Sequence, residues 1–489
     1  MRLTELSAGS GLAREGLANG DPEISGLGAD SRTLAPGFLF AALAGARGDG
    51  CDFAGEAVEK GAVAILTDRP RALALSPSER ERIAILVDPN PRRRLALFAA
   101  RFYGRQPRTI AAVTGTNGKT SVAHFTREIW TALGRPAASL GTLGLVTPKG
   151  RRPGALTSPD PVALCRDLAA LAEEGVDHLA VEASSHGLDQ CRLDGLRVAA
   201  AAFTNLSRDH LDYHRDMAHY RAAKERLFRV LLDPAGTAVL NAESEESGAL
   251  SALCRARGVR VLAYGQKKGA DLSLLAARPL PQGQQVELSL GGLNHSLALP
   301  LYGAFQAENA LAALGLAIAT GAEAEDAVAV LPRLSGVPGR MQALPSPPRG
   351  GLVIVDYAHT PDALAHALKA LRPYAQGRLF ALFGCGGERD VGKRPLMGKI
   401  AASLADRVFV TDDNPRGESP GKIRAAVREG APQAREIGDR REAIAAALAE
   451  LAAGDVLLVA GKGHESTQII GDKAYPFEDA AVIGEILGR

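Results

Sequence analysis

The sequence predicts an α/β protein with three domains, and three observations lead to this fold class. Short apolar runs alternate with Ala- and Leu-rich helical segments along the whole chain. The chain has 489 residues, a length that suggests roughly three domains. Many of the apolar runs end in polar, Gly-rich or charged tips. Such tips are typical of open parallel sheets, in which ligands bind at the carboxyl ends of the strands.

We predict domain boundaries at the points where this alternation is interrupted. The predicted domains are 1–106, 107–332 and 333–489, and the first ends in the basic, Pro-containing stretch "YGRQPRT". The segments that predict strands and their tips are 38–43, 62–67, 83–88, 108–113, 178–184, 198–205, 351–360, 378–387, 407–416 and 455–465. The segments with the clearest helical pattern are 53–61, 217–228 and 441–454.

Composition argues against several classes of protein. The net charge of +2 gives no reason to expect nucleic acid or an anionic membrane as a partner. The amino terminus lacks the apolar core of a signal peptide, and no apolar run approaches the ~20 residues that span a bilayer. Five cysteines are scattered without metal-ligand spacing. We therefore expect a soluble protein of a reducing cytoplasm. We also expect it to be a monomer that acts on small molecules.

The stretch "VTGTNGKTS" at 113–121 is a short version of a phosphate-binding loop. It follows the apolar run 108–113 and precedes a helix whose apolar residues are Val122, Phe125, Ile129, Trp130 and Leu133. Strand, glycine loop and helix together bring backbone N–H groups and the positive end of the helix dipole to an anion. Lys119 would then reach the terminal phosphates, and Thr120 would hold Mg²⁺ through its hydroxyl.

Two further strand tips of the middle segment carry candidate metal ligands. The run "HLAVE" ends at Glu182, and the run "VAAAAFTN" leads to His210 in "LSRDHLDYH". A carboxylate and a hydroxyl suit Mg²⁺, which prefers oxygen ligands. His210 on its own is as typical of a hydrogen-bonded turn as of a metal site, and Lys224 on the helix at 217–228 is typical of a solvated surface charge.

The strand tips of the third segment carry acids and guanidinium groups. They comprise Asp356, Arg389, the run 413–416 ("DNPR") and the run 461–465 ("GKGHE"). Such groups on adjacent tips could receive an amino acid, with arginine holding the carboxylate and an acid holding the ammonium. Surface ion pairs on loops are the alternative.

The motifs together identify the chain as resembling the Mur ligases of bacterial cell-wall synthesis. They are "GTNGKT", "EASSHGLDQCR", "TNLSRDHLDYH", "HYRAAK", "VPGRMQ", "VDYAHTPDAL", "GCGGERDVGKRPLMG", "TDDNPR" and "AGKGHE", in order over essentially the whole chain. The resemblance is greatest to the members that add the third residue of the stem peptide. It implies an N-terminal domain for the nucleotide sugar, a central phosphate-loop ATPase domain and a C-terminal Rossmann-like domain.

The resemblance implies how ATP and Mg²⁺ are bound. The implied ATP-binding residues are Gly115, Thr116, Asn117, Gly118, Lys119, Thr120, Ser121, Asn309 and Arg340. The implied Mg²⁺ ligands are Thr120, Glu182, His210 and Lys224, the last as a carbamate formed with CO₂. Lys119, Lys224 and His210 are the implied catalytic residues. The chain departs from the family at Gln306, where asparagine is usual.

The second implied substrate is UDP-N-acetylmuramoyl-L-alanyl-D-glutamate, whose carboxylate ATP would activate as an acyl phosphate. The implied binding residues are the loop 45–50 and Ala29, Ser31, Thr157, Ser158, Ser184, Gln190 and Arg192. Cys51 stands where histidine is common, and Ala29 and Leu156 lie at variable positions.

The third domain would select the incoming amino acid. The "DNPR" run resembles the signature of meso-diaminopimelate ligases, and the implied pocket is Arg389, Asp413, Asn414, Pro415, Arg416, Gly461 and Glu465. Lysine-adding relatives lack the arginine, because lysine has no second carboxylate. The alternatives are the same ligase using L-lysine, a ligase like folylpolyglutamate synthetase, and a non-catalytic nucleotide-dependent regulator.

Overall fold

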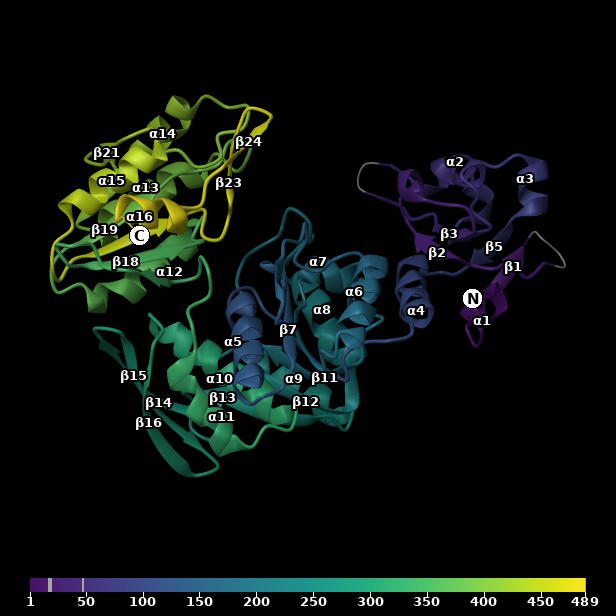
Figure 1. Ribbon diagram of the computed structural model, residues 1–489, viewed down its shortest axis with the longest axis horizontal. Helices are drawn as coiled ribbons and strands as arrows, with labels where there is room; N and C mark the ends of the chain where they lie inside the picture. Colours follow the sequence, from purple (N-terminus) through teal and green to yellow (C-terminus); the bar gives the residue numbers. More distant parts are fainter. Residues whose placement is uncertain (16–19, 46–47, 489) are drawn as a thin grey trace. The chain divides into compact units, whose positions relative to one another are not determined.

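The computed structural model describes residues 1–15, 20–45 and 48–488, and its contacts divide the chain into two compact units (Figure 1). The first unit comprises Met1–Ala263 and Gly315–Glu323, and the second comprises Tyr264–Leu314 and Ala324–Arg489. Strand β13 (Arg260–Gly265) and helix α10 (Ala304–Ala319) carry the chain from one unit into the other.

The first unit begins with a small sheet in the order β1-β5-β4-β3-β2. Its strands are parallel except for β1, which pairs antiparallel with β5. The strands are β1 (Ala13–Glu15), β2 (Gly26–Gly28), β3 (Phe38–Ala41), β4 (Ala64–Thr67) and β5 (Ala84–Val87). The helices are α1 (Leu3–Ser7), α2 (Ala54–Glu59), α3 (Pro77–Arg82) and α4 (Pro91–Tyr103). Apolar side chains fill both faces of this sheet, which explains the continuous apolar runs of its central strands.

A larger sheet of the first unit follows, in the order β12-β11-β6-β10-β7-β8-β9. The strands from β12 to β7 are parallel, and β8 and β9 add an antiparallel edge. The strands are β6 (Thr109–Thr114), β7 (Ala137–Gly141), β8 (Gly144–Thr147), β9 (Gly150–Arg152), β10 (His178–Glu182), β11 (Val198–Phe203) and β12 (Leu232–Asn241). The helices are α5 (Lys119–Ala132), α6 (Pro161–Glu173), α7 (Ser185–Asp189), α8 (Met217–Arg226) and α9 (Ser247–Ala256).

Helix α5 shows why the sequence folds in this way. The side chains of Val122, Phe125, Ile129 and Trp130 are all fully buried, as their spacing predicts. Burial of each such side chain contributes about 1.5–3 kcal/mol. The Trp130 indole N–H donates a hydrogen bond to Thr320 Oγ1 at 3.1 Å, so no polar atom of this ring is left unsatisfied. This packing fixes the start of α5 at the carboxyl end of β6.

The second unit contains an antiparallel group of three strands and a mostly parallel sheet. The sheet has the order β17-β18-β22-β19-β20-β21, and β17 is antiparallel to its neighbour. The strands are β14 (Leu272–Leu280), β15 (Gly283–Leu290), β16 (Leu293–Leu299), β17 (Gln342–Leu344), β18 (Leu352–Asp356), β19 (Leu379–Phe383), β20 (Arg407–Val410), β21 (Arg435–Glu436), β22 (Val456–Ala460), β23 (Thr467–Ile470) and β24 (Lys473–Pro476).

Helices cover both faces of this parallel sheet (Figure 1). One apolar core includes residues of α12, α13 and α14, and the other includes residues of α15 and α16. The helices of the unit are α11 (Ala324–Val330), α12 (Pro361–Leu371), α13 (Lys393–Leu404), α14 (Pro420–Arg428), α15 (Arg440–Glu450) and α16 (Asp479–Ile486). No helix in the described part of the chain is long and apolar enough to cross a membrane.

The predicted α/β class is confirmed, and the domain boundaries at 106 and 332 stay predictions. The structure adds antiparallel elements that strand–helix alternation did not predict, namely β8–β9, β14–β16 and the hairpin β23–β24. Some predicted helices are shorter than expected. The segment 441–454 forms a helix only to Glu450, and a π-helical turn at Leu227–Leu231 follows α8.

Candidate active site

The phosphate loop lies between β6 and α5, where the sequence predicts it. Thr204 and Asn205, at the end of the neighbouring strand β11, hold this loop. Thr204 Oγ1 donates to Asn117 O at 2.6 Å, and Asn205 Oδ1 accepts from Asn117 N at 2.9 Å. Gly115 has a φ of 147°, and a Cβ there would collide with Thr204 Oγ1. The close approach of the two strand tips therefore requires glycine at this position.

Two lysine side chains converge on one carbonyl of the loop. Lys119 Nζ donates to Gly115 O at 2.9 Å, and Lys224 Nζ donates to the same oxygen at 2.7 Å. Lys224 is 1% exposed, and its Nζ lies 4.3 Å from the centre of the Tyr220 ring. Burial, followed by repulsion from Lys119, holds the pKa of Lys224 well below its usual range. The two lysines predicted to be catalytic thus lie together at one carbonyl of the loop.

Glu182 and Thr120 are also together, at the start of α5. Thr120 Oγ1 donates to Glu182 Oε2 at 3.0 Å, and both residues are buried. Thr142, which sequence reasoning did not single out, orients this carboxylate. Its backbone N–H donates to Glu182 Oε1 at 2.7 Å and its hydroxyl donates to Oε2 at 3.1 Å. Thr142 directly follows β7, so only the parallel pairing of β7 with β10 brings it to Glu182.

These oxygen atoms fit a magnesium ion. A hydroxyl and a carboxylate at hydrogen-bond distance are hard donors, and Mg²⁺ is commonly held by one or two protein oxygens together with phosphate and water. Among the described residues no group of three or more His, Cys, Asp or Glu side chains is arranged as a metal site. The phosphates of a nucleotide would therefore have to supply much of the coordination.

His210 lies in a turn with a left-handed backbone, near His186 and Tyr220. Its φ is 53°, its side chain is 46% exposed, and its ring centre is 5.0 Å from that of His186. Its ring is 6.2 Å from the Tyr220 ring, and Lys224 packs on Tyr220. Burial, together with repulsion from His210, lowers the pKa of His186 to about 4. The metal-ligand role of His210 stays a prediction.

The residues predicted to bind the UDP-linked substrate form a connected network in the larger sheet. Ser158 Oγ donates to Glu182 O at 3.0 Å and lies 3.0 Å from Ser184 Oγ. Arg192 donates to Ser158 O at 2.8 Å and to Gln190 Oε1 at 2.6 Å. Thr157 joins through its hydroxyl, 3.2 Å from that of Thr142. The network therefore connects Thr157, Ser158, Ser184, Gln190 and Arg192 to Glu182, directly or through Ser158 and Thr142.

The remaining predicted residues of that substrate site belong to the small sheet. Ala29 directly follows β2, and Ser31 Oγ donates to Glu56 Oε2 at 2.9 Å. In the predicted loop 45–50, residues 46 and 47 lie outside the described residues.

The second unit carries the predicted nucleotide residues Asn309 and Arg340. Asn309 Nδ2 donates to Gln306 Oε1 at 2.9 Å, and both side chains are buried. Gln306, the position that departs from the family pattern, thus directly contacts Asn309. Arg340 stacks on the Tyr357 ring at 4.4 Å, and its Nε is buried without a partner among the described residues.

The predicted amino-acid pocket is assembled at the carboxyl ends of β18, β19, β20 and β22. Arg416 has a φ of 51°, and its Nη1 donates to Gly387 O at 2.8 Å. Both side-chain hydrogen bonds of Arg416 to the described residues use Nη1, and Nε and Nη2 have no hydrogen-bond partner among these residues. Gly387 must be glycine, because a Cβ there would collide with Pro415 O. One edge of the Arg416 fork is therefore held, and the other is available to a ligand.

Tyr357 is a central residue of this pocket that sequence reasoning did not single out. Burial, and then the carboxylates of Glu465 and Asp413, raise the pKa of Tyr357, while Arg340 and Arg389 oppose this shift. Asp413 is buried and Arg389 is exposed. The acids and guanidinium groups predicted on separate strand tips thus act on one ring, and their role in binding an amino acid stays a prediction.

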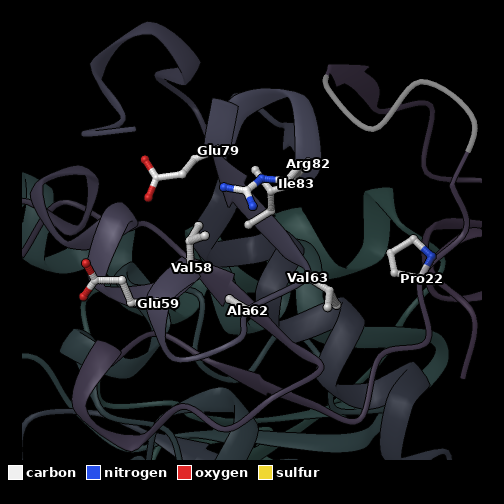
Figure 2. A pocket seen from close by; sticks show the side chains of 8 residues that line it. All are labelled: Pro22, Val58, Glu59, Ala62, Val63, Glu79, Arg82 and Ile83. Atoms are coloured by element: carbon white, nitrogen blue, oxygen red, sulfur yellow. The ribbon is translucent and has the colours of Figure 1, made fainter. Parts of the chain in front are cut away.

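Figure 2 shows a different pocket, in the small sheet of the first unit. Its lining residues are Pro22, Val58, Glu59, Ala62, Val63, Glu79, Arg82 and Ile83. None of these is a predicted site residue, and the charged side chains at its rim come from α2 and α3 and not from strand tips. This pocket is separate from the chemistry described above.

Three family models match the chain, each over a different segment. They describe the Mur ligase family catalytic domain at residues 23–103, the Mur ligase middle domain at 113–317 and the Mur ligase glutamate ligase domain at 339–463. A UDP-N-acetylmuramoyl-L-alanyl-D-glutamate–2,6-diaminopimelate ligase of Bradyrhizobium diazoefficiens is 52% identical, with 95% of each chain covered. The ligase of the same name from Caulobacter vibrioides is 51% identical over 94% of this chain and 95% of its own.

A solved structure agrees with these relatives. A structure of a UDP-N-acetylmuramoyl-L-alanyl-D-glutamate–2,6-diaminopimelate ligase is 34% identical, covers 95% of each chain and superposes with a TM-score of 0.72. The short loop with its two lysines, the buried Glu182 and the "DNPR" turn all lie in the matched segments. The family models and the relatives thus agree with the fold, and the chain belongs to the Mur ligase family.

Proposed function

We propose that this protein is an ATP-dependent ligase that joins meso-diaminopimelate to the D-glutamate carboxylate of UDP-N-acetylmuramoyl-L-alanyl-D-glutamate, forming ADP and phosphate. The observation that carries this proposal is the placement of Glu182 under the phosphate loop. Its side chain contacts Thr120, and its backbone carbonyl accepts from Ser158 of the predicted substrate network. The nucleotide and the acid that it activates would thus share one residue. Relatives of 51–52% identity carry this activity in their names.

The proposed reaction has two steps. A carboxylate oxygen attacks the terminal phosphorus of ATP, the bond from this phosphorus to the bridging oxygen breaks, and ADP leaves. The amine of the amino acid, after losing a proton, then attacks the acyl carbon. A C–N bond forms, the C–O bond to phosphate breaks, and phosphate leaves. Activation is needed because a free carboxylate is a poor electrophile.

The residues of the chain contribute positioning and charge neutralisation. The backbone N–H groups at the start of α5 would hold the phosphate oxygens, and Lys119 would leave Gly115 O to contact the transferring group. Mg²⁺ held by Thr120 and Glu182 would neutralise phosphate charge. Ser158, Ser184 and Arg192 would fix the substrate carboxylate at the loop. ATP and UDP-linked precursors are metabolites of the cytoplasm, so we place the reaction there.

Lys224 should be carbamylated in the active protein. A neutral amine attacks CO₂, and burial together with repulsion from Lys119 lowers the pKa of Lys224, which favours its neutral amine. The new N–C bond and the loss of a proton give an anion beside Lys119, so repulsion becomes attraction. We expect the protein to take up label from isotopically enriched bicarbonate, detected by NMR. Lys224→Ala should lose the signal, and an added short-chain carboxylate should partly restore its activity.

An unlabelled Lys224 in a fully active protein at saturating bicarbonate would refute this modification. Lys149→Ala is a suitable control, because Lys149 is an exposed lysine that pairs with Glu174 on the surface. The Lys149→Ala protein still contains Lys224, so it should take up the label and keep the signal of the parent protein.

Phosphate release tests the proposed function. With ATP and Mg²⁺ present, release should require both UDP-N-acetylmuramoyl-L-alanyl-D-glutamate and diaminopimelate. A nucleotide-dependent regulator would instead hydrolyse ATP without this double dependence. A folylpolyglutamate synthetase would require a folate in place of the UDP-linked peptide.

A further inference from the structure

We propose that Lys462 is a positioning residue for the amino-acid pocket, and this inference rests on the proposed function. Lys462 holds Asn414 and Glu465 in place and thereby fixes the loop that carries Arg416. The contacts of Lys462 lie around the hairpin β23–β24, which follows the "GKGHE" turn.

Lys462 is fully buried, with 0% of its surface exposed. Its Nζ donates to Thr467 O at 2.6 Å, to Asn414 Oδ1 at 3.2 Å and to Glu465 Oε2 at 3.2 Å. An ammonium group has three N–H donors, and each has an acceptor here. The side chain is therefore not available to a substrate, and its effect must pass through these partners.

The contacts of Lys462 leave Asn414 with one orientation. Asn414 Oδ1 accepts from Lys462 and from Ile469 N at 3.0 Å, and its Nδ2 donates to Glu465 Oε2 at 2.9 Å. A flipped amide would place its donors against Lys462 and Ile469. The cation thus sets which way the Asn414 amide points, and this amide in turn holds the Glu465 carboxylate.

The hairpin β23–β24 connects Lys462 to Arg416 through backbone hydrogen bonds. Arg416 N donates to Ile469 O at 3.1 Å, and Gly471 N donates to Arg416 O at 2.8 Å. Gln468 Nε2 donates to Asp413 O at 2.7 Å. These bonds hold Arg416 in its left-handed conformation, which a residue other than glycine adopts only when its surroundings enforce it. Because Lys462 bonds Thr467 O at the start of β23, it anchors the strand that supports this conformation.

A purely structural role would not require a lysine. Burying an ammonium carries a large desolvation cost, and an apolar side chain of similar volume is often as stabilising at a buried position. Two of the three partners of Lys462, Asn414 after β20 and Glu465 after β22, belong to the predicted pocket, and the third, Thr467, begins β23. Asp455, just before the same strand, offers a matched control at the opposite end. It is buried and accepts from Arg378 N at 2.7 Å and from Arg378 Nη2 at 2.8 Å.

Lys462→Met in the full-length protein tests the proposal. We expect KM for diaminopimelate to rise about tenfold or more, while KM for ATP and for the UDP-linked peptide changes little. Asp455→Asn should lower the melting temperature without changing KM for diaminopimelate. In a double mutant, Lys462→Met should add little to the effect of Arg416→Ala, because both act on one contact. Lys462→Gln, which keeps two N–H donors, should give an intermediate KM and decides the matter if the Met variant does not fold.

The outcomes separate this inference from the proposed function. If the unmodified protein ligates diaminopimelate and the Lys462 variants keep its KM, the positioning role is wrong. Equal losses for all three substrates, or effects that add fully in the double mutant, would also overturn it. If the unmodified protein does not use diaminopimelate at all, the proposed function has failed.

Discussion

Replacing Lys119 with alanine should lower the ligation turnover by about a hundredfold or more, with little change in the melting temperature. Lys119 lies at the start of α5, where its ammonium already contacts Gly115 O and Thr116 O of the phosphate loop. In the proposed reaction this charge stabilises the phosphoryl group as it moves to the carboxylate. The negative charge on the reacting oxygen atoms grows in the transition state. Loss of the Lys119 ammonium should therefore reduce kcat more than it raises KM for ATP. Steady-state kinetics with both substrates saturating measures the effect.

Lys149→Ala is also the control for this substitution. Lys149 side-chain exposure is 71%, and it pairs with Glu174 on the surface, so its loss should leave turnover unchanged. Near-normal turnover in a folded Lys119→Ala protein would show that the loop does not hold the transferring phosphate.

Arg416→Ala should reduce kcat/KM for diaminopimelate by roughly thirty- to a thousandfold, equivalent to about 2–4 kcal/mol. Diaminopimelate carries a second carboxylate at its far end, and the planar fork of arginine matches a carboxylate with two parallel N–H donors. One end of the Arg416 fork is occupied by Gly387 O at 2.8 Å, which orients the other. Kinetics with diaminopimelate and with lysine, at saturating ATP and UDP-linked peptide, measure the change.

The Arg416→Ala protein should not become an efficient lysine ligase. Arg389 and the remaining charges around Tyr357 would still be unsuited to the free ammonium of lysine. Arg428→Ala provides a control, since Arg428 lies on α14 and pairs with Glu436 at the surface. An unchanged kcat/KM for diaminopimelate in the Arg416→Ala protein would show that another group binds the distal carboxylate.

The sequence predicted those parts of the candidate site that are formed by residues close to one another in the chain. The loop at Gly115–Ser121 and the acid at Glu182 each follow an apolar strand, so local pattern was enough to place them at the carboxyl edge of a sheet. Thr142 was not predictable in this way. It contacts Glu182, which is 40 residues away in the chain, only because β7 and β10 pair in parallel.

The same reason explains why the supports of the second pocket were not predicted. Lys462 contacts Asn414 across 48 residues, and nothing in "GKGHE" alone shows that its lysine is buried. Strand–helix alternation predicted parallel sheets and the positions of their strands along the chain. The hairpin β23–β24 was not predicted, because its apolar and polar residues do not form the continuous apolar run typical of a buried parallel strand.

The identity of the two molecules that the protein joins can be tested directly. The most direct test incubates the full-length protein with ATP, Mg²⁺ and UDP-N-acetylmuramoyl-L-alanyl-D-glutamate, and adds either meso-diaminopimelate or L-lysine. Mass spectrometry of the UDP-linked product, together with ADP measured in the same samples, gives the result. We predict one ADP formed for each diaminopimelate joined, and little product with lysine. A preference for lysine, or ADP formed without a longer UDP-linked peptide, would contradict the account.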